Sequence, residues 1–366
     1  MKIKLLFLFV LINIVLVNAQ PVQFNQYQSN TLYNNPAFTG TSEQPLFSAY
    51  FGQAVYVKDL YSSSPYNDYT PIRYIGDNFA LSYQQYWNKI RGSFGIKITS
   101  NYYPFESNYH CSTQSINFSY SPTIKILKKL CVKPSIEIGY YSEKLTAPEV
   151  IYTLASIDTF STTSSQYYQY NYNIQEIPNN FTSDYYNINS GILFYTKNFH
   201  LGFSLGHLNL PKSYGFHVGY NSHNPNLQLL SDTFYITNTY SQNSFTFNSG
   251  FNINSKDSTK TWTISPHFYL KYDDYAGYIL LGSGFRYKKV IAGLDLCTYD
   301  NNGSAIIFTL GYQVNRFMIS YGYTTPAFYI LISDNIGTKR SLNSIQLIYS
   351  LPKKEHSTPP VYTSMY

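Results

Sequence analysis

Apolar and polar residues alternate with a period of two along most of this chain, which is the pattern of β-strands with two different faces. Phe94, Ile96 and Ile98, for example, alternate with Gly95 and Lys97. The apolar face is rich in aromatic residues, whereas the other face is mostly Gly, Ser, Thr and Asn with few charges. A soluble sandwich would wet its polar face with many Lys and Glu residues. The pattern therefore favours an all-β transmembrane antiparallel β-barrel, with lipid outside and small polar groups in the lumen.

The alternating segments predict about 14 strands, an even number that returns both ends of the wall to the periplasm. They lie near residues 46–56, 76–87, 91–100, 112–126, 130–142, 184–196, 198–208, 243–254, 260–272, 276–287, 289–299, 303–313, 315–325 and 341–351. Every second connection is then short, and the other connections hold the long insertions 57–75, 143–183, 209–242 and 326–340. We interpret the long set as extracellular loops, with 143–183 as a surface loop or fold-over cap. Residues 214–220 also alternate and are assigned to a loop.

The register assigns each side chain to one face of the wall. Facing lipid we expect Ile96, Ile136, Phe203, Phe268 and Phe308. On the inward register lie the charged residues Lys97, Glu137, Arg286, Asp295 and Arg316. A charge that faced lipid near the midplane would cost about 2–4 kcal/mol, and this register avoids that cost. Two interpretations of the inward charges remain open: ion pairs that rigidify the barrel, or a charged lumen for a substrate or plug.

Arg286 and Asp295 are candidates for one such ion pair. They lie on adjacent predicted strands joined by a tight turn at Lys288. Opposite charges on neighbouring strands can pair across the ladder. We predict that the two side chains approach each other inside the barrel.

The first residues predict export from the cytoplasm. Lys2 and Lys4 precede an apolar run over 5–17, and Val17-Asn18-Ala19 has small residues at the cleavage positions. This pattern predicts a signal peptide at 1–19, without a nearby cysteine for lipid attachment. No other segment approaches about 18 consecutive apolar residues. The remaining chain divides into a periplasmic N-terminal segment at 20–45, the barrel at 46–351 and a C-terminal tail at 352–366.

Composition agrees with an aromatic-rich membrane wall. The chain has 41 Tyr and 25 Phe, but only 12% charged residues, whereas soluble domains carry about 25%. The net charge of +6 forms no basic run, so no nucleic-acid surface is indicated. Cys111, Cys131 and Cys297 form no CxxC pair and have no zinc-site spacing.

Motifs for enzymatic chemistry are missing from the sequence. It contains no HExxH, no GxSxG, no P-loop and no dinucleotide-binding fingerprint. No nucleophile–base pair is visible that would support a barrel-embedded hydrolase. We therefore expect a protein that is not an enzyme and that has no cofactor, metal site or catalytic residue.

The segment after the signal contains a specific motif. Its matching positions are Phe24, Gln26, Tyr27, Asn30, Leu32, Asn35, Pro36, Ala37 and Gly40. They resemble the opening of the PorP/SprF family of type IX secretion membrane proteins in Bacteroidetes. Weaker similarities follow at 202–208, 284–287, 319–323 and 345–349, whereas 41–75 lacks the family's Arg-Gln-Trp segment.

The resemblance implies an outer-membrane component of type IX secretion. Such proteins support secretion or surface attachment of adhesin-type proteins with a C-terminal targeting domain, including adhesins of gliding motility. The implied partners are that C-terminal domain, periplasmic secretion components and outer-membrane lipid. An uptake channel for a small or apolar solute is the alternative, since several barrels of this size have that role.

Residues 24–40 are the segment we single out for function. Asn35-Pro36 favours an extended or turn conformation and resists a helix, and the segment is too short to fold alone. Two arrangements follow: it plugs or lines the mouth of the lumen, or it docks on a periplasmic partner.

Overall fold

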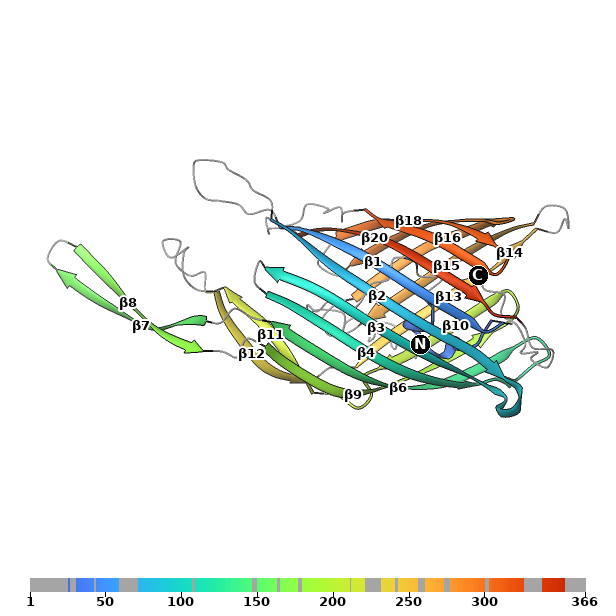
Figure 1. The fold of residues 1–366 in the computed structure, drawn as a ribbon, viewed down its shortest axis with the longest axis horizontal. Helices are drawn as coiled ribbons and strands as arrows, with labels where there is room; N and C mark the ends of the chain where they lie inside the picture. Colours follow the sequence, from blue (N-terminus) through green and yellow to red (C-terminus); the bar gives the residue numbers. More distant parts are fainter. Residues whose placement is uncertain are drawn as a thin grey trace, which may run out of the picture.

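The computed structural model describes residues 26, 31–42, 44–58, 72–106, 109–146, 150–162, 165–176, 180–210, 212–220, 232–240, 243–255, 261–272, 277–299, 303–325 and 338–352. Most of these residues build a closed antiparallel barrel of 14 wall strands. Each wall strand pairs with the wall strands that come before and after it in the sequence. The sheet closes where β1 pairs with β20, and it continues unbroken where β13 pairs with β15 (Figure 1). The predicted signal peptide and most of the predicted C-terminal tail lie outside the described residues.

The wall strands are β1 (Leu46–Lys58), β2 (Ile72–Trp87), β3 (Gly92–Glu106), β4 (Tyr109–Pro122) continued by β5 (Ile124–Lys125), β6 (Cys131–Thr146), β9 (Asn180–Tyr195), β10 (Phe199–Gly206), β13 (Ser244–Phe251) continued by β14 (Ile253–Asn254), β15 (Trp262–Tyr272), β16 (Gly277–Tyr287), β17 (Val290–Tyr299), β18 (Gly303–Val314), β19 (Phe317–Thr324) and β20 (Thr338–Ser350). All fourteen predicted strands are present. The tight connections fall where the alternation predicted them, including η3 (Asn88–Ile90) between β2 and β3.

Two β-hairpins occupy the long connections, where the sequence analysis expected loops. One consists of β7 (Val150–Thr162) and β8 (Ser165–Glu176), and the other of β11 (Lys212–Tyr220) and β12 (Asp232–Tyr240). The predicted loop 143–183 is therefore corrected, because β6 continues to Thr146, β9 begins at Asn180, and the paired strands β7 and β8 lie between them in the chain. The assignment of 214–220 outside the wall is confirmed. Both hairpins lie at the end of the barrel that has the long connections, and β7 and β8 extend well beyond it (Figure 1).

The two faces of the wall follow the predicted register. Ile136 and Phe308 point outward and are 49% and 48% exposed, and Ile96, Phe203 and Phe268 are half-buried on the same face. The residues that alternate with them are buried on the inner face, and several of them are small or polar: Gly95, Ser135, Gly202, Ser204 and Thr309. Because a shift of one residue would exchange the faces, this alternation fixes the register of every wall strand.

Apolar inward residues are concentrated on one side of the barrel. Strands β15 to β18 contribute a buried cluster of Tyr269, Leu280, Cys297 and Ile307. A second cluster brings together Ile291, Met318 and Ile348. The opposite side, from β2 to β13, has a largely polar inner face and holds the N-terminal segment.

None of the described helices is long and apolar enough to cross a membrane.

Candidate functional site: the plugged lumen

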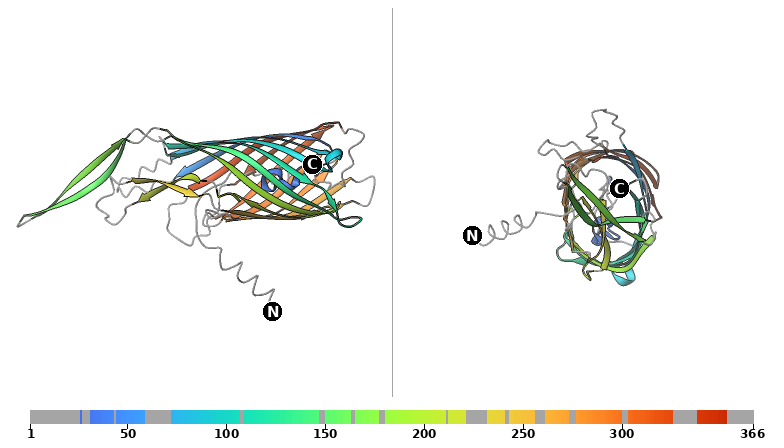
Figure 2. Two further views of the ribbon diagram at one scale, coloured as in Figure 1. Left: turned by 90° about the horizontal axis from the view of Figure 1, so that it is seen from below. Right: turned by 90° about the vertical axis from the view of Figure 1, so that its left-hand side faces the viewer.

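Residues 31–42 lie inside the barrel, surrounded by the wall (Figure 2). They form one short turn of helix, α2 (Thr31–Asn34), followed by the 3-10 turn η2 (Pro36–Phe38). Every residue from Asn35 to Thr41 is buried, and Asn35, Ala37 and Thr39 have no exposed surface. The segment predicted to be periplasmic is thus a plug in its described part, which we call the lumen plug (residue 26 and residues 31–42).

Asn35 and Pro36 determine the shape of the plug. The backbone of Asn35 is extended, as expected before a proline, and this ends α2. Its side chain caps η2, because Oδ1 accepts a hydrogen bond from the Ala37 amide at 2.9 Å. Its Nδ2 then donates to the Phe203 carbonyl of β10 at 3.2 Å. One amide group therefore both folds the plug and attaches it to the wall.

The backbone of the plug is bound by side chains of the wall. Ser204 and Thr246 both donate to the Asn34 carbonyl, at 3.1 and 3.2 Å. The Gly40 amide donates to Gln84 Oε1 at 2.7 Å. These contacts satisfy groups that so short a helix cannot satisfy internally. The plug can therefore keep this conformation only inside the barrel.

Hydroxyl and amide pairs tie the plug to further strands. The Thr39 hydroxyl donates to the Pro36 carbonyl at 2.6 Å, so at 2.8 Å it accepts from Ser119 of β4. Gln26 donates to Ser344 of β20 at 2.9 Å and accepts from Ser320 of β19. The plug is thus bonded to strands from both sides of the barrel.

A buried ion pair lies against α2. Lys97 Nζ on β3 is 2.7 Å from Glu137 Oε2 on β6, and both residues are at most 5% exposed. The same ammonium donates to the Leu32 carbonyl at 3.3 Å and lies 5.6 Å from the centre of the Tyr33 ring. Asn189 also donates to Glu137, at 2.9 Å. Lys97 and Glu137 lie on the inner face as predicted, and they hold the plug.

Burial raises the pKa of the Tyr33 phenol. A phenol with a raised pKa stays neutral near pH 7. The lysine therefore faces a neutral ring, and the Glu137 carboxylate is its counter-charge.

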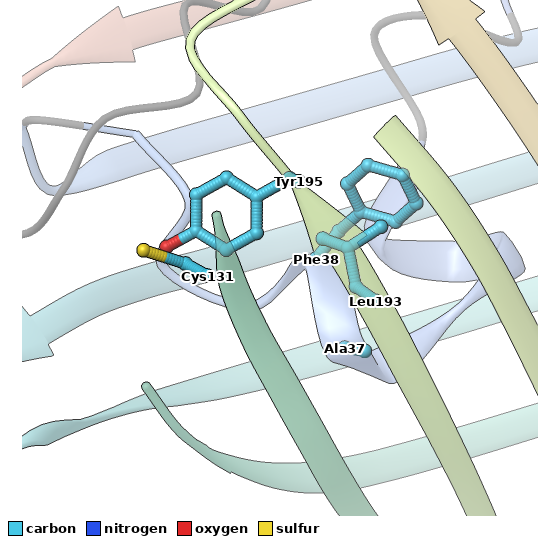
Figure 3. Close-up of a cluster of buried hydrophobic side chains, with 5 residues drawn as sticks. All are labelled: Ala37, Phe38, Cys131, Leu193 and Tyr195. Carbon is cyan, nitrogen blue, oxygen red and sulfur yellow. The ribbon is translucent and has the colours of Figure 1, made fainter. Parts of the chain in front are cut away.

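Apolar contacts cover the remaining face of the plug. Ala37 and Phe38 pack in a buried cluster with Cys131, Leu193 and Tyr195 of β6 and β9 (Figure 3). The Phe38 ring also makes an edge contact with His200, with 5.4 Å between the ring centres. The plug is therefore held by shape as well as by hydrogen bonds.

The other charged residues predicted on the inner face are Arg286, Asp295 and Arg316, and their contacts differ from the prediction. Asp295 is 2.9 Å from His267 Nε2 on β15 and is not paired with Arg286. The reason is the register: Asp295 lies opposite Gly282, over which its carboxylate crosses β16, whereas Arg286 lies opposite Ile291 and donates to Gln313. The predicted pair between Arg286 and Asp295 is wrong.

Arg316 also needs correction. It was predicted on the inner face but is exposed in the two-residue turn between β18 and β19. Asn315 precedes it with a left-handed backbone (φ 51°), which a tight hairpin turn requires. Arg316 therefore belongs to the turn, although the alternation assigned it to the wall.

Some important residues were not singled out from the sequence. Lys133 has no exposed surface and donates to Ser93 at 2.8 Å. Asn189 and His200 were missed too. Lys133 could have been found, because it has the same inward register as Glu137. Asn189 and His200 have no charge or motif that separates them from ordinary wall residues.

Three motif positions, Phe24, Tyr27 and Asn30, lie outside the described residues. Among the described residues, no group of His, Cys, Asp or Glu side chains could hold a metal ion. The inner wall can therefore bind the N-terminal segment of the chain, and this segment fills part of the lumen.

Comparisons with known proteins agree with this architecture. The family described as "Type IX secretion system membrane protein PorP/SprF" matches residues 16–338. Curated proteins gave no sequence match. Among solved structures, the chain is similar to the TodX deltaS2S3 mutant monoaromatic hydrocarbon channel, with a TM-score of 0.52, 10% identity, and coverage of 87% of this chain and 93% of that one. A Pseudomonas aeruginosa FadL homologue has a TM-score of 0.49 at 10% identity, covering 92% of this chain and 95% of the other. At such identities the likeness to TodX shows the barrel fold alone.

Proposed function

Because the chain belongs to the PorP/SprF family of type IX secretion system membrane proteins, we propose that it supports secretion or surface attachment of adhesin-type proteins through their C-terminal targeting domain. The family and the barrel fold place the chain in the bacterial outer membrane as a type IX secretion component. The adhesin and the periplasmic secretion components are the partners that this proposal adds.

One observation carries the proposal furthest: the family motif is the part of the chain that fills the lumen. Gln26, Leu32, Asn35, Ala37 and Gly40 are buried inside the barrel. A segment bonded to both sides of the wall leaves no free path for a folded protein. We therefore expect the partner to dock at an end of the barrel. We expect the plug to hold that end in the conformation that binds the partner.

Deletion of residues 24–40 with the signal peptide retained tests the proposal. We expect the barrel to insert at normal levels while the adhesin no longer reaches the cell surface, as measured by surface labelling of the adhesin. Failure of insertion would make the segment structural. Survival of both insertion and surface display would refute a role of the plug in secretion.

A milder variant separates loss of the plug from misfolding. Asn35→Ala removes the cap of η2 and the bond to Phe203 but leaves the wall unchanged. Asn343→Ala, on the outward register of β20, is the matched control. We expect reduced adhesin display for Asn35→Ala and normal display for Asn343→Ala.

The alternative is an uptake channel for a small or apolar solute. The two apolar clusters on the inner face of β15 to β20 favour it. Their side chains are buried, so the uptake role also requires this part of the lumen to open and present them to the solute. An uptake role predicts that cells lacking the protein take up an aromatic hydrocarbon more slowly, with adhesin display unchanged. The secretion role predicts the reverse pair of results.

A further inference from the structure

The short turns at one end of the barrel are basic. Each of the five short turns that the structure describes carries Lys or Arg and no Asp or Glu. The exposed basic residues of these turns are Lys89, Arg91, Lys125, Lys128, Lys129, Lys197, Lys288, Lys289 and Arg316. We call these nine residues the basic rim. The sixth short connection, 256–260, lies outside the described residues, and its sequence has two lysines and one aspartate.

The opposite end of the barrel has mixed charges. Described charged residues nearest the long connections include Asp77, Glu143, Lys144, Asp184 and Lys271. Acidic and basic groups therefore occur together there. The excess of positive charge is a property of the short-turn end, and a general surplus of lysine in the chain does not explain it.

The basic rim borders the lipid-facing surface directly. Just inside the turns, the outer face carries exposed aromatic residues from strands all around the wall: Phe47, Trp87, Tyr120, Phe199, Phe251, Tyr287, Tyr312 and Phe317. Aromatic girdles of this kind mark the level of the lipid headgroups. The lysines therefore stand at the level where phosphate groups lie.

The turns themselves are partly apolar. Ile126 and Leu127 are 56% and 63% exposed between Lys125 and Lys128. In water such a turn would expose apolar surface without benefit. At a bilayer interface the apolar side chains contact acyl chains, while the lysine stems reach out to the headgroups.

Local backbone preference does not explain the basic residues. Arg91 and Lys288 have φ values of 49° and 54°, in the left-handed region where Gly or Asn is easier to accommodate. Lys288 Nζ lies 5.3 Å from the centre of the Tyr287 ring in the aromatic girdle. A positive charge is thus present at positions where the fold alone favours another residue.

We propose that the basic rim binds the phosphate headgroups of anionic phospholipids in the leaflet at the short-turn end. Positive charge on five described turns spaced around the barrel fits lipid, which surrounds a barrel on every side. An acidic protein would be expected to meet a patch on one side of the barrel. The proposal does not depend on the secretion role.

Binding of soluble short-chain lipids to the full-length protein in neutral detergent micelles tests the proposal. The probes are dihexanoyl-phosphatidylglycerol and dihexanoyl-phosphatidylcholine, and native mass spectrometry counts the bound molecules. The test variant is Lys128→Gln/Lys129→Gln. The matched control, Lys144→Gln/Lys271→Gln, removes the same charge at the other end of the barrel.

We expect the parent and the control to prefer phosphatidylglycerol. The rim variant should bind it up to about fivefold more weakly for each lysine removed, and phosphatidylcholine binding should not change. A further variant, which adds Lys89→Gln, Lys197→Gln and Lys289→Gln, should lose most of the preference. If that variant does not fold, the two-lysine pair decides the question.

Two results would overturn the proposal. One is an unchanged phosphatidylglycerol preference in the folded rim variants. The other is unchanged lipid binding together with loss of a periplasmic protein that co-purifies with the parent, which would assign the rim to a protein partner.

Discussion

Lys97 and Glu137 lie on strands separated by β4, and both side chains reach the same point below α2. Removing two charges from water costs several kcal/mol, about as much as their attraction returns. Additional bonds therefore matter, and here the Leu32 carbonyl and the Asn189 amide provide them. This cluster joins two wall strands and the plug.

Removing one member of this pair should destabilise the barrel strongly. Lys97→Met leaves the Glu137 carboxylate buried without its counter-charge, and we expect a loss of about 3–5 kcal/mol in the free energy of unfolding. The double variant Lys97→Met/Glu137→Leu should recover most of this loss. Urea unfolding in detergent micelles measures both, with Lys144→Met as an exposed control. A single variant as stable as the parent would contradict the role of the pair.

Gly191 leaves room for the plug. A Cβ atom at this position would lie 2.3 Å from Asn35 Oδ1, so Gly191→Ala should displace the plug while the wall remains folded. Gly293→Ala is the control, because its nearest contact is Thr309 Cβ at 3.2 Å on a strand away from the plug. We expect faster protease cleavage of the N-terminal segment in Gly191→Ala only. Equal cleavage in the two variants would show that the plug tolerates the methyl group.

Individual residues also show what the sequence can and cannot predict. Period-two alternation assigned Lys97, Glu137 and Asp295 to the inner face correctly. It could not predict their partners, because partners depend on the offset between strands that are not adjacent in sequence. Asp295 meets His267 two strands away across Gly282, and no pattern within one strand contains that information.

At the level of elements, the wall strands were predictable because each has one apolar face. The hairpin of β7 and β8 was missed, since strands rich in Tyr, Asn, Gln and Thr lack the alternation that identifies a wall strand. The sequence analysis singled out the segment that forms the plug but did not predict its conformation. Asn35 and Pro36 shape its helical turns, but the turns also need wall side chains that satisfy the backbone, and the local sequence does not reveal those contacts.

The plug should limit the conductance of the barrel. Because it is bonded to β2, β4, β10, β13, β19 and β20, it occupies the lumen from side to side. We expect deletion of residues 24–40 to raise single-channel conductance in planar bilayers severalfold, since the remaining inner face is polar over half of the wall. Gly293→Ala serves as the folded control with parental conductance. Identical conductance with and without the plug would mean that another part of the chain closes the lumen.

At the scale of the whole molecule, polarity differs in two directions. Across the wall, aromatic and aliphatic residues outside contrast with serine, threonine and asparagine inside over half of the circumference. Along the barrel axis, the basic rim contrasts with the mixed charges and long hairpins of the other end. The first difference makes the chain a membrane protein, and the second distinguishes its two ends.

The orientation of the barrel in the membrane is therefore testable. Single-chain bacterial barrels keep short turns in the periplasm and long loops outside. Both ends of the wall, Leu46 and Ser350, lie at the short-turn end. We expect an impermeant maleimide to modify Lys144→Cys and Asp184→Cys on intact cells, in a background with Cys111, Cys131 and Cys297 replaced by Ser. Lys128→Cys and Arg316→Cys should react only after the outer membrane is permeabilised. The opposite labelling pattern would place the basic rim at the cell surface, where its lipid partner would be the anionic outer leaflet.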